Sequence, residues 1–222
     1  MAGYSIDLTT ISLSEFADTL LTVELLPSRR MLADHIVAVT PRLEDKGVGD
    51  LAQLRKLLAK KANYPDLAGE LHVDVEYLTV LNREVNSYVS KPVPLAKLEY
   101  LDDEELASLD SLGVRSTKDL YEQGVRRQER SLMAEQSAVG RDRLDRALRL
   151  ANLVRVNGVG RAFAEFLLEA GITGPADFLD RDLERMVDEY AAAVGDDAPK
   201  LRIEDLEYVQ RYCRGLAEDI EW

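Results

Sequence analysis

SLDSLGVRSTKDL, at residues 108–120, aligns without a gap with two other stretches of this chain: RLEDKGVGDLAQL at 42–54 and FLLEAGITGPADF at 166–178. A glycine occupies the same position in all three stretches and is followed by Val or Ile; these are Gly47, Gly113 and Gly171. Glycine accepts the left-handed backbone conformation that commonly ends a helix. Three positions later each stretch has a residue that favours a helix N-cap: Asp50, Ser116 and Gly174. Each stretch therefore predicts a helix, a tight glycine turn and a second, capped helix.

The similarity continues downstream, where apolar residues recur at helical spacing in residues 73–85, 139–151 and 201–213. The third copy is displaced relative to the first two, and we expect a short insertion near AAAVGDDAPK, residues 191–200. Clean alternation of apolar and polar residues, which is typical of strands, is nearly absent. The pattern predicts an all-α fold of three tandem repeats of roughly four helices each. The expected domains are N-terminal helices with repeat one at 1–90, repeat two at 91–154 and repeat three at 155–222.

Composition limits the classes of protein to consider. The chain has 222 residues, a net charge of −13 and one cysteine, Cys213, so no intramolecular disulfide can form. An acidic protein has no general electrostatic attraction to DNA or anionic membranes, although it can still carry a local basic patch. No apolar run approaches the length of a membrane-spanning helix, and the N-terminus lacks a signal-peptide pattern. We therefore expect a cytoplasmic protein without membrane association, in which Cys213 packs on the apolar side of a helix. The last five residues, EDIEW, are expected to fray unless Trp222 docks on the body.

One segment carries a specific motif. VNGVGRAFAEFLL, residues 156–168, fits the helix-hairpin-helix pattern of two apolar positions, two glycines and a small residue, which are here Val156, Val159, Gly158, Gly160 and Ala164. Together with LLPSRRML, YLTVLNREVNSY and KPVPL, this segment resembles a bacterial family of tandem helix-hairpin-helix-like repeats, the domain of unknown function numbered 4332. The resemblance extends over nearly the whole chain and implies the fold. It implies DNA binding without sequence preference only through the wider helix-hairpin-helix superfamily, because the closer family has no assigned activity.

The hairpin supplies the candidate nucleic-acid site. Because Gly158 and Gly160 have no Cβ, a phosphate can approach the backbone, and the N–H groups around Val159 and at the start of the next helix form an anion site. Arg161 follows directly and adds positive charge. Repeats one and two have DHI and YLD at the equivalent positions and lack the glycines, so one hairpin of three is expected to bind phosphate. The alternative is that the glycines only make a tight turn between two helices.

Basic residues concentrate just before this hairpin. Residues 115–161 contain 11 basic and 6 acidic side chains, whereas the rest of the chain is strongly acidic. Arg143, Arg146 and Arg149 recur every three residues and are expected to share one helical face. They form either a stripe that follows phosphates or a solvated face paired with Asp142 and Asp145.

Catalytic signals in the sequence are weak. The two histidines, His35 and His72, have no metal-ligand spacing to each other or to the cysteine, and no nucleophile, P-loop or dinucleotide-binding motif occurs. We therefore expect no enzyme activity, no catalytic residue, no metal site and no cofactor.

Two functions remain, and they name different partners. The first is weak, sequence-non-specific nucleic-acid binding through the backbone amides of residues 158–161, with DNA as the ligand. The alternative is a helical-repeat protein–protein adaptor whose hairpins are purely structural. The first predicts that Arg143, Arg146 and Arg161 share an exposed surface without carboxylate partners, whereas the second predicts salt bridges beside an exposed apolar patch. The sequence does not decide the oligomeric state.

Overall fold

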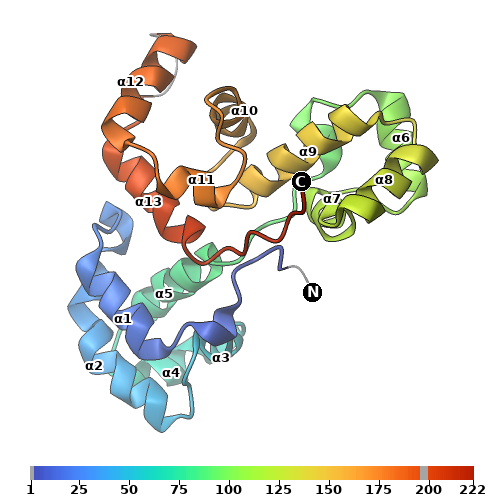
Figure 1. The fold of residues 1–222 in the computed structure, drawn as a ribbon. Coiled ribbons are helices and arrows are strands. Elements are labelled where there is room, and N and C mark those ends of the chain that lie inside the picture. Colours follow the sequence, from blue (N-terminus) through green and yellow to red (C-terminus); the bar gives the residue numbers. More distant parts are fainter. Residues whose placement is uncertain (1–2, 196–199) are drawn as a thin grey trace. The chain divides into compact units, whose positions relative to one another are not determined.

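The computed structural model describes residues 3–195 and 200–222, and the chain divides into two compact units. One unit is Asp7–Val89, and the other joins Met1–Ile6 to Ser90–Trp222. Within the described ranges, the regular elements of both units are helices, accompanied by two isolated backbone bridges (Figure 1). The expectation of an all-α fold is therefore confirmed for this part of the chain. None of the described helices is long and apolar enough to cross a membrane.

The unit Asp7–Val89 is built around α5. Its helix α1 packs on α2, while α2, α3 and α4 all contact α5 (Figure 1). The apolar positions predicted for the last helix, Leu78, Leu81 and Val85, are all fully buried. The elements of this unit are η1 Leu8–Thr10, α1 Leu13–Thr22, η2 Pro27–Arg29, α2 Met31–Asp45, α3 Leu51–Leu57, η3 Lys61–Asn63, α4 Tyr64–Leu71 and α5 Val75–Ser87.

In the second unit, α9 and α13 are the central helices. Helices α7, α8 and α10 pack on α9, and α11 and α12 pack on α13 (Figure 1). Cys213 is 3 % exposed on the apolar side of α13, as predicted, and burial raises the pKa of its thiol to about 12. The elements are η4 Leu95–Leu98, α6 Asp103–Ser111, α7 Thr117–Gly124, α8 Arg127–Gln136, α9 Arg141–Val154, α10 Arg161–Glu169, α11 Pro175–Leu179, α12 Leu183–Val194 and α13 Ile203–Cys213.

The three predicted glycine turns have the same geometry. Their glycines, Gly47, Gly113 and Gly171, have φ angles of +79°, +78° and +78°. In each turn the buried residue after the glycine donates its N–H to a carbonyl five positions earlier, at 3.0 Å, 3.0 Å and 2.8 Å. This bond satisfies a carbonyl in the last turn of the first helix, which is the role expected of a left-handed helix C-cap. The helix–glycine–helix prediction is confirmed at all three places.

The helix after each turn begins where the sequence predicts, with one difference in how it is capped. The side chains of Asp50 and Ser116 accept the backbone N–H three residues later. Gly174 has no side chain, and the carboxylate of Glu218, from the C-terminal tail, instead accepts the Ala176 N–H over 2.8 Å. A Cβ at position 174 would lie 2.9 Å from this carboxylate. Gly174 thus leaves room for a capping group supplied by a distant part of the chain.

Two expectations about segmentation stay predictions. The expected insertion near residues 191–200 includes residues 196–199, which lie outside the described residues. The division into domains at 1–90, 91–154 and 155–222 is finer than the division into two compact units, whose boundary falls between Val89 and Ser90.

Candidate functional site

The predicted site lies at the hairpin 155–160, which joins α9 to α10. Val156 and Val159 are buried there, and the Val159 N–H donates to the Val156 carbonyl over 3.1 Å. Ala164 is fully buried in α10, the helix that packs against α9. The apolar and small residues of the motif therefore lie in the core, where they allow α9 and α10 to pack against each other.

The two glycines of the hairpin have different surroundings. Gly158 has φ +94°, and a Cβ there would lie 3.0 Å from Cγ2 of Val209 in α13. The Asn157 side chain donates to the Tyr208 hydroxyl over 2.8 Å and holds the same hairpin on α13. Gly160, by contrast, has nothing within 4 Å of the position of its missing Cβ. The absence of a Cβ at Gly158 therefore allows α13 to pack closely on the hairpin, whereas at Gly160 it leaves open space.

Three backbone N–H groups at the start of α10 have no acceptor among the described residues. Gly160 is the N-cap and contributes no side-chain hydrogen bond to the helix. For the described part of the chain, no acceptor is found for the N–H groups of Gly160, Arg161 and Ala162. A helix N-terminus carries partial positive charge, so such groups attract anions. This helix end is compatible with the predicted phosphate contact.

Two of the predicted arginines are engaged by carboxylates. Arg143 Nη2 lies 2.6 Å from Glu105 Oε2 and 2.9 Å from the Tyr100 carbonyl. The hydrogen bond from Arg143 lowers the pKa of the Glu105 carboxyl and raises that of the guanidinium. Arg161 lies 3.0 Å from Glu99 and 3.2 Å from Glu165. The expected exposed surface of arginines without carboxylate partners is therefore not found for these two residues.

The remaining arginines of the predicted stripe contact aromatic rings. The Arg146 guanidinium lies 5.4 Å from the centre of the Tyr100 ring, and the Arg143 guanidinium lies 4.9 Å from the same ring. The Arg149 guanidinium lies 4.5 Å from the Trp222 ring, and its buried Nε has no hydrogen-bond partner among the described residues. The three arginines therefore divide between two aromatic partners.

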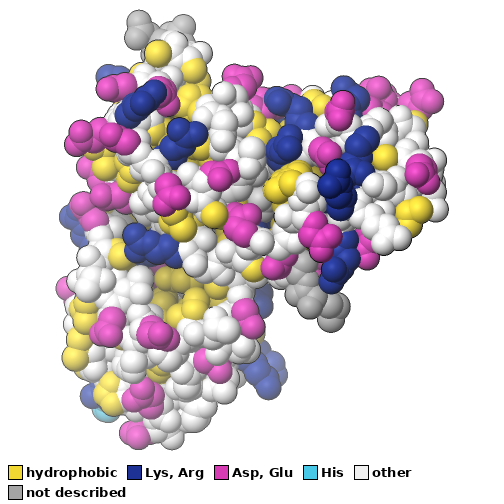
Figure 2. Space-filling model, in the orientation of Figure 1, with side chains coloured by type: hydrophobic (Ala, Val, Ile, Leu, Met, Phe, Trp, Pro, Cys, Tyr) yellow, Lys and Arg dark blue, Asp and Glu magenta, His cyan; other side chains and the backbone are white. Residues whose placement is uncertain are grey.

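One of the two alternatives for this stripe pairs it with Asp142 and Asp145, and for Asp145 the structure shows other partners. Asp145 contacts Arg130 at 2.6 Å and Arg141 at 3.2 Å, and not the arginines of the stripe. Space-filling representation shows basic and acidic side chains interleaved around α8 and α9, without an unbroken basic face in this view (Figure 2). Local charge counting along the sequence located the basic residues and missed their neutralisation by acidic residues from other elements.

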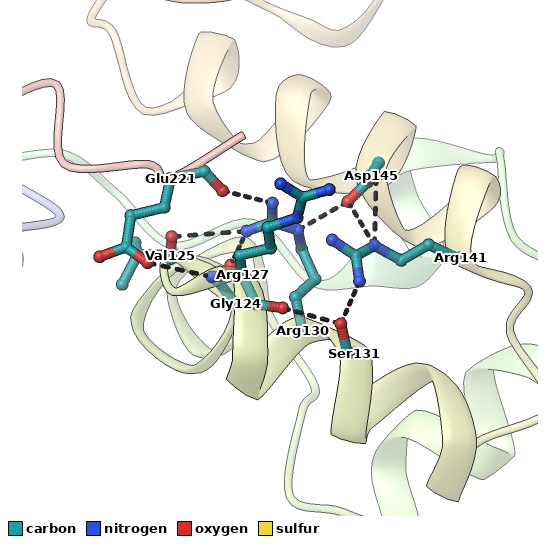
Figure 3. A network of polar contacts seen from close by, with 8 residues as sticks. All are labelled: Gly124, Val125, Arg127, Arg130, Ser131, Arg141, Asp145 and Glu221. Carbon is teal, nitrogen blue, oxygen red and sulfur yellow. Dashed lines mark hydrogen bonds and ion pairs between the residues drawn. The ribbon is translucent and has the colours of Figure 1, made fainter.

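Sequence reasoning missed the buried Arg130, which organises the end of the chain (Figure 3). Its side chain is 0 % exposed, and it donates to the backbone carbonyls of Gly124 and Glu221 as well as to Asp145. The Glu221 N–H donates back to the Val125 carbonyl over 2.9 Å. Trp222 lies against the same guanidinium, 5.3 Å from the ring centre. The tail therefore docks on α8 and α9 through Trp222, which is the alternative to fraying that the sequence left open.

A second buried arginine, Arg155, ties both ends of the chain to the end of α9. It donates to the Gly3 carbonyl over 2.9 Å, to the Asn152 side chain over 2.9 Å and to the Ala217 carbonyl. Its guanidinium also lies 4.3 Å from the centre of the Tyr121 ring. Burial lowers the pKa of Arg155 from its ordinary value. Arg155 directly precedes the predicted hairpin motif in sequence but is structural, because its donors are used inside the fold.

An open hollow between α7 and α8 has a mixed apolar and acidic lining. Its volume is about 400 Å³. Leu132 on α8 is 47 % exposed, and Glu122 and Glu129 lie in the same lining. The lining residues are Leu112, Glu122, Gln123, Glu129, Leu132, Met133 and Gln136. The hollow therefore offers apolar contact together with negative charge.

Comparison with known proteins identifies a family for the larger unit. Residues 99–213, which include α6 to α13, match the family model described as Domain of unknown function (DUF4332). The match does not include residues 1–98, where the resemblance was also expected. No curated protein and no solved structure matches the chain. Because the model matches more than half of the sequence, the chain belongs to the family of Domain of unknown function DUF4332.

Proposed function

We propose that the protein is a non-catalytic helical-repeat adaptor that binds another protein through the hollow between α7 and α8. In this proposal three repeats of four helices form the scaffold, and the glycine hairpins serve as structural turns. The observation that carries the proposal is the exposed Leu132 beside Glu122 and Glu129. The carboxylates on Arg143 and Arg161 support it further, because they neutralise the surface that a nucleic acid would otherwise contact.

The chemistry of the hollow favours a basic, amphipathic segment of the partner. Apolar side chains of such a segment would cover Leu132 and Met133, and its Lys or Arg side chains would face Glu122 and Glu129. Among the described residues, the ion pair of Glu122 is a long contact of 3.6 Å with Lys118, which leaves its carboxylate available to a closer cation. The net charge of −13 adds long-range attraction toward a basic partner.

A labelled peptide tests the adaptor proposal. The probe is a helical peptide with Leu on one face and Lys on the other, and fluorescence anisotropy measures its dissociation constant. Reversing both charges, Glu122→Lys with Glu129→Lys, should weaken binding by about tenfold or more. Glu135→Lys is the control, because Glu135 is an exposed carboxylate on α8, the helix of Glu129, and lies outside the lining of the hollow. Equal loss in the control and the double variant would contradict the proposal.

A second candidate function is weak, sequence-non-specific nucleic-acid binding through Gly158–Arg161, with a helix-hairpin-helix affiliation. The open backbone donors of Gly160, Arg161 and Ala162 favour it. Phosphate bound there would contact the backbone of one hairpin, with Arg143, Arg146 and Arg149 as charged neighbours. Binding through one hairpin alone is expected to be weak.

A substitution at Gly160 should remove DNA binding without destabilising the fold. Gly160→Asp introduces a carboxylate that caps the N–H groups at the start of α10, and the open space and φ of −84° at this position accommodate it. Duplex DNA binding, measured by anisotropy between about 50 and 200 mM salt, should be lost in this variant. Gly140→Asp is the control, because Gly140 is the N-cap of α9 with the same open space. DNA binding that survives Gly160→Asp would exclude the hairpin as the phosphate site.

A further inference from the structure

The unit Asp7–Val89 contains a basic segment that the net charge conceals. Residues 51–65 hold four basic side chains, Arg55, Lys56, Lys60 and Lys61, and no acidic one. All four are exposed: Arg55 and Lys56 lie on α3, Lys61 lies on η3, and Lys60 lies between the two elements. In the described part of the chain, none of the four makes an ion pair. These cations differ in this respect from Arg143 and Arg161 of the other unit, which carboxylates neutralise.

Arg55 and Lys56 line a hollow between α3 and α5. Its volume is about 520 Å³, within the range of small-molecule binding sites. Leu8, Ala52 and Ala59 give it apolar walls, and its other lining residues are Asn82 and Asn86. No Asp or Glu from the described residues belongs to the lining. The hollow therefore has two cations, two amides and apolar contact surface, and no negative charge of its own.

The guanidinium of Arg55 is hydrogen-bonded to Asn86, which is itself hydrogen-bonded to Asn82. Arg55 Nε donates to Asn86 Oδ1 over 3.0 Å. Asn86 in turn donates from Nδ2 to Asn82, at 2.8 Å to the side-chain oxygen and 2.7 Å to the carbonyl. Because Asn82 and Asn86 are one turn apart on α5, the chain of bonds is anchored to a helix. Nε is the atom of Arg55 that these bonds use, and no hydrogen bond from its two terminal nitrogens is found among the described residues, which leaves both for a ligand.

We propose that this hollow is a binding site for a small molecule that carries a phosphate group. An oriented guanidinium presents parallel N–H donors that match two phosphate oxygens, and the neighbouring ammonium of Lys56 adds the second positive charge that a phosphomonoester dianion requires. The apolar walls would contact the rest of the ligand. The site lies in a different unit from the adaptor hollow and the hairpin, so the proposal stands independently of both functions above.

Nuclear magnetic resonance of the whole protein tests this site. The probes are inorganic phosphate and phenyl phosphate, and the signal followed is the Asn86 side-chain amide, with sodium chloride at equal ionic strength as the blank. Both probes should shift this signal saturably below about 20 mM, and phenyl phosphate should bind more tightly because of the apolar walls. Arg55→Gln should weaken the dissociation constants by about tenfold or more. Lys60→Gln, a change of the same charge outside the lining, should leave them unchanged.

Three results would overturn the proposal. The first is the absence of a saturable shift with either probe. The second is wild-type affinity in Arg55→Gln, with circular dichroism showing that both variants are folded. The third is a shift produced only by a short single-stranded oligonucleotide and by neither small phosphate, which would assign the basic segment to a polymer instead.

Discussion

Removing the carboxylate of Asp145 should destabilise the unit Ser90–Trp222 by about 3 kcal/mol. The side chain of Arg130 is 0 % exposed and that of Asp145 is 23 % exposed, so Asp145→Ala leaves a buried guanidinium without its ion-pair partner. Loss of one member of a buried pair costs about 3–5 kcal/mol. The lower end applies here, because the guanidinium keeps the carbonyls of Gly124 and Glu221 and the lost carboxylate is partly solvated.

The position of Trp222 provides the assay. It is the only tryptophan of the chain, and its ring lies 5.3 Å from the guanidinium carbon of Arg130. Intrinsic fluorescence during urea or thermal unfolding therefore reports on this unit and on this network. A loss of about 3 kcal/mol corresponds to a decrease in melting temperature of roughly 6–12 °C for a unit of this size.

Glu165→Ala is the matched control for Asp145→Ala. It removes a carboxylate from the pair with Arg161, in which both side chains are about one-third exposed, at 37 % and 34 %. Exposed pairs contribute about 1 kcal/mol or less, so this variant should unfold close to the wild type. If Asp145→Ala costs less than about 1 kcal/mol, or no more than Glu165→Ala, the reasoning about the buried guanidinium is refuted.

Three further predictions concern a titrating pair, the thiol and the hairpin glycines. Because Arg143 lowers the pKa of Glu105, the pair's contribution to stability is complete above the ordinary glutamate pKa and disappears as the pH falls through the lowered value. Arg143→Gln should therefore lower the melting temperature at neutral pH. The difference in melting temperature from the wild type should narrow as the pH falls below about 4.3 and disappear below the lowered pKa; a difference independent of pH would contradict this. With its pKa raised to about 12, the buried Cys213 thiol should react with a disulfide reagent at about pH 8 no faster than the protein unfolds, and immediate labelling of the native protein would show an accessible thiol instead. Gly158→Ala should cost about 1–2 kcal/mol or more in urea unfolding, from its φ of +94° and the close contact with α13, whereas Gly160→Asp should change stability by a few tenths of a kcal/mol at most. Similar losses at the two glycines would disprove the packing role of Gly158.

Much of the fold was predictable because its signals are local. The glycine turns, the side-chain caps at Asp50 and Ser116, and the buried stripe of α5 each depend on residues within about two helical turns of one another. The hairpin motif likewise identified buried positions correctly, at Val156 and Ala164. Such features require no knowledge of which elements meet in space.

The candidate sites were less predictable because charge acts through space. A net count over residues 115–161 suggested a basic surface, but Arg143 meets a glutamate 38 positions away. The net charge summed over the rest of the chain concealed the basic residues of 51–65. These cations have no carboxylate partner in the described part of the chain. Whether a basic residue is available to a ligand depends on its spatial neighbours, which neither spacing nor composition contains.

The sequence by itself determined the all-α class, the positions of the three glycine turns and the buried side of the helices in residues 73–85, 139–151 and 201–213, because backbone conformation and amphipathic spacing are properties of neighbouring residues. Only the tertiary structure decided how the chain ends are held and which charges remain available. Arg130 reaches a carbonyl 91 positions away, and Arg155 reaches one 152 positions away. A buried guanidinium must find acceptors wherever the fold brings them, so its partners follow from packing and not from the order of residues.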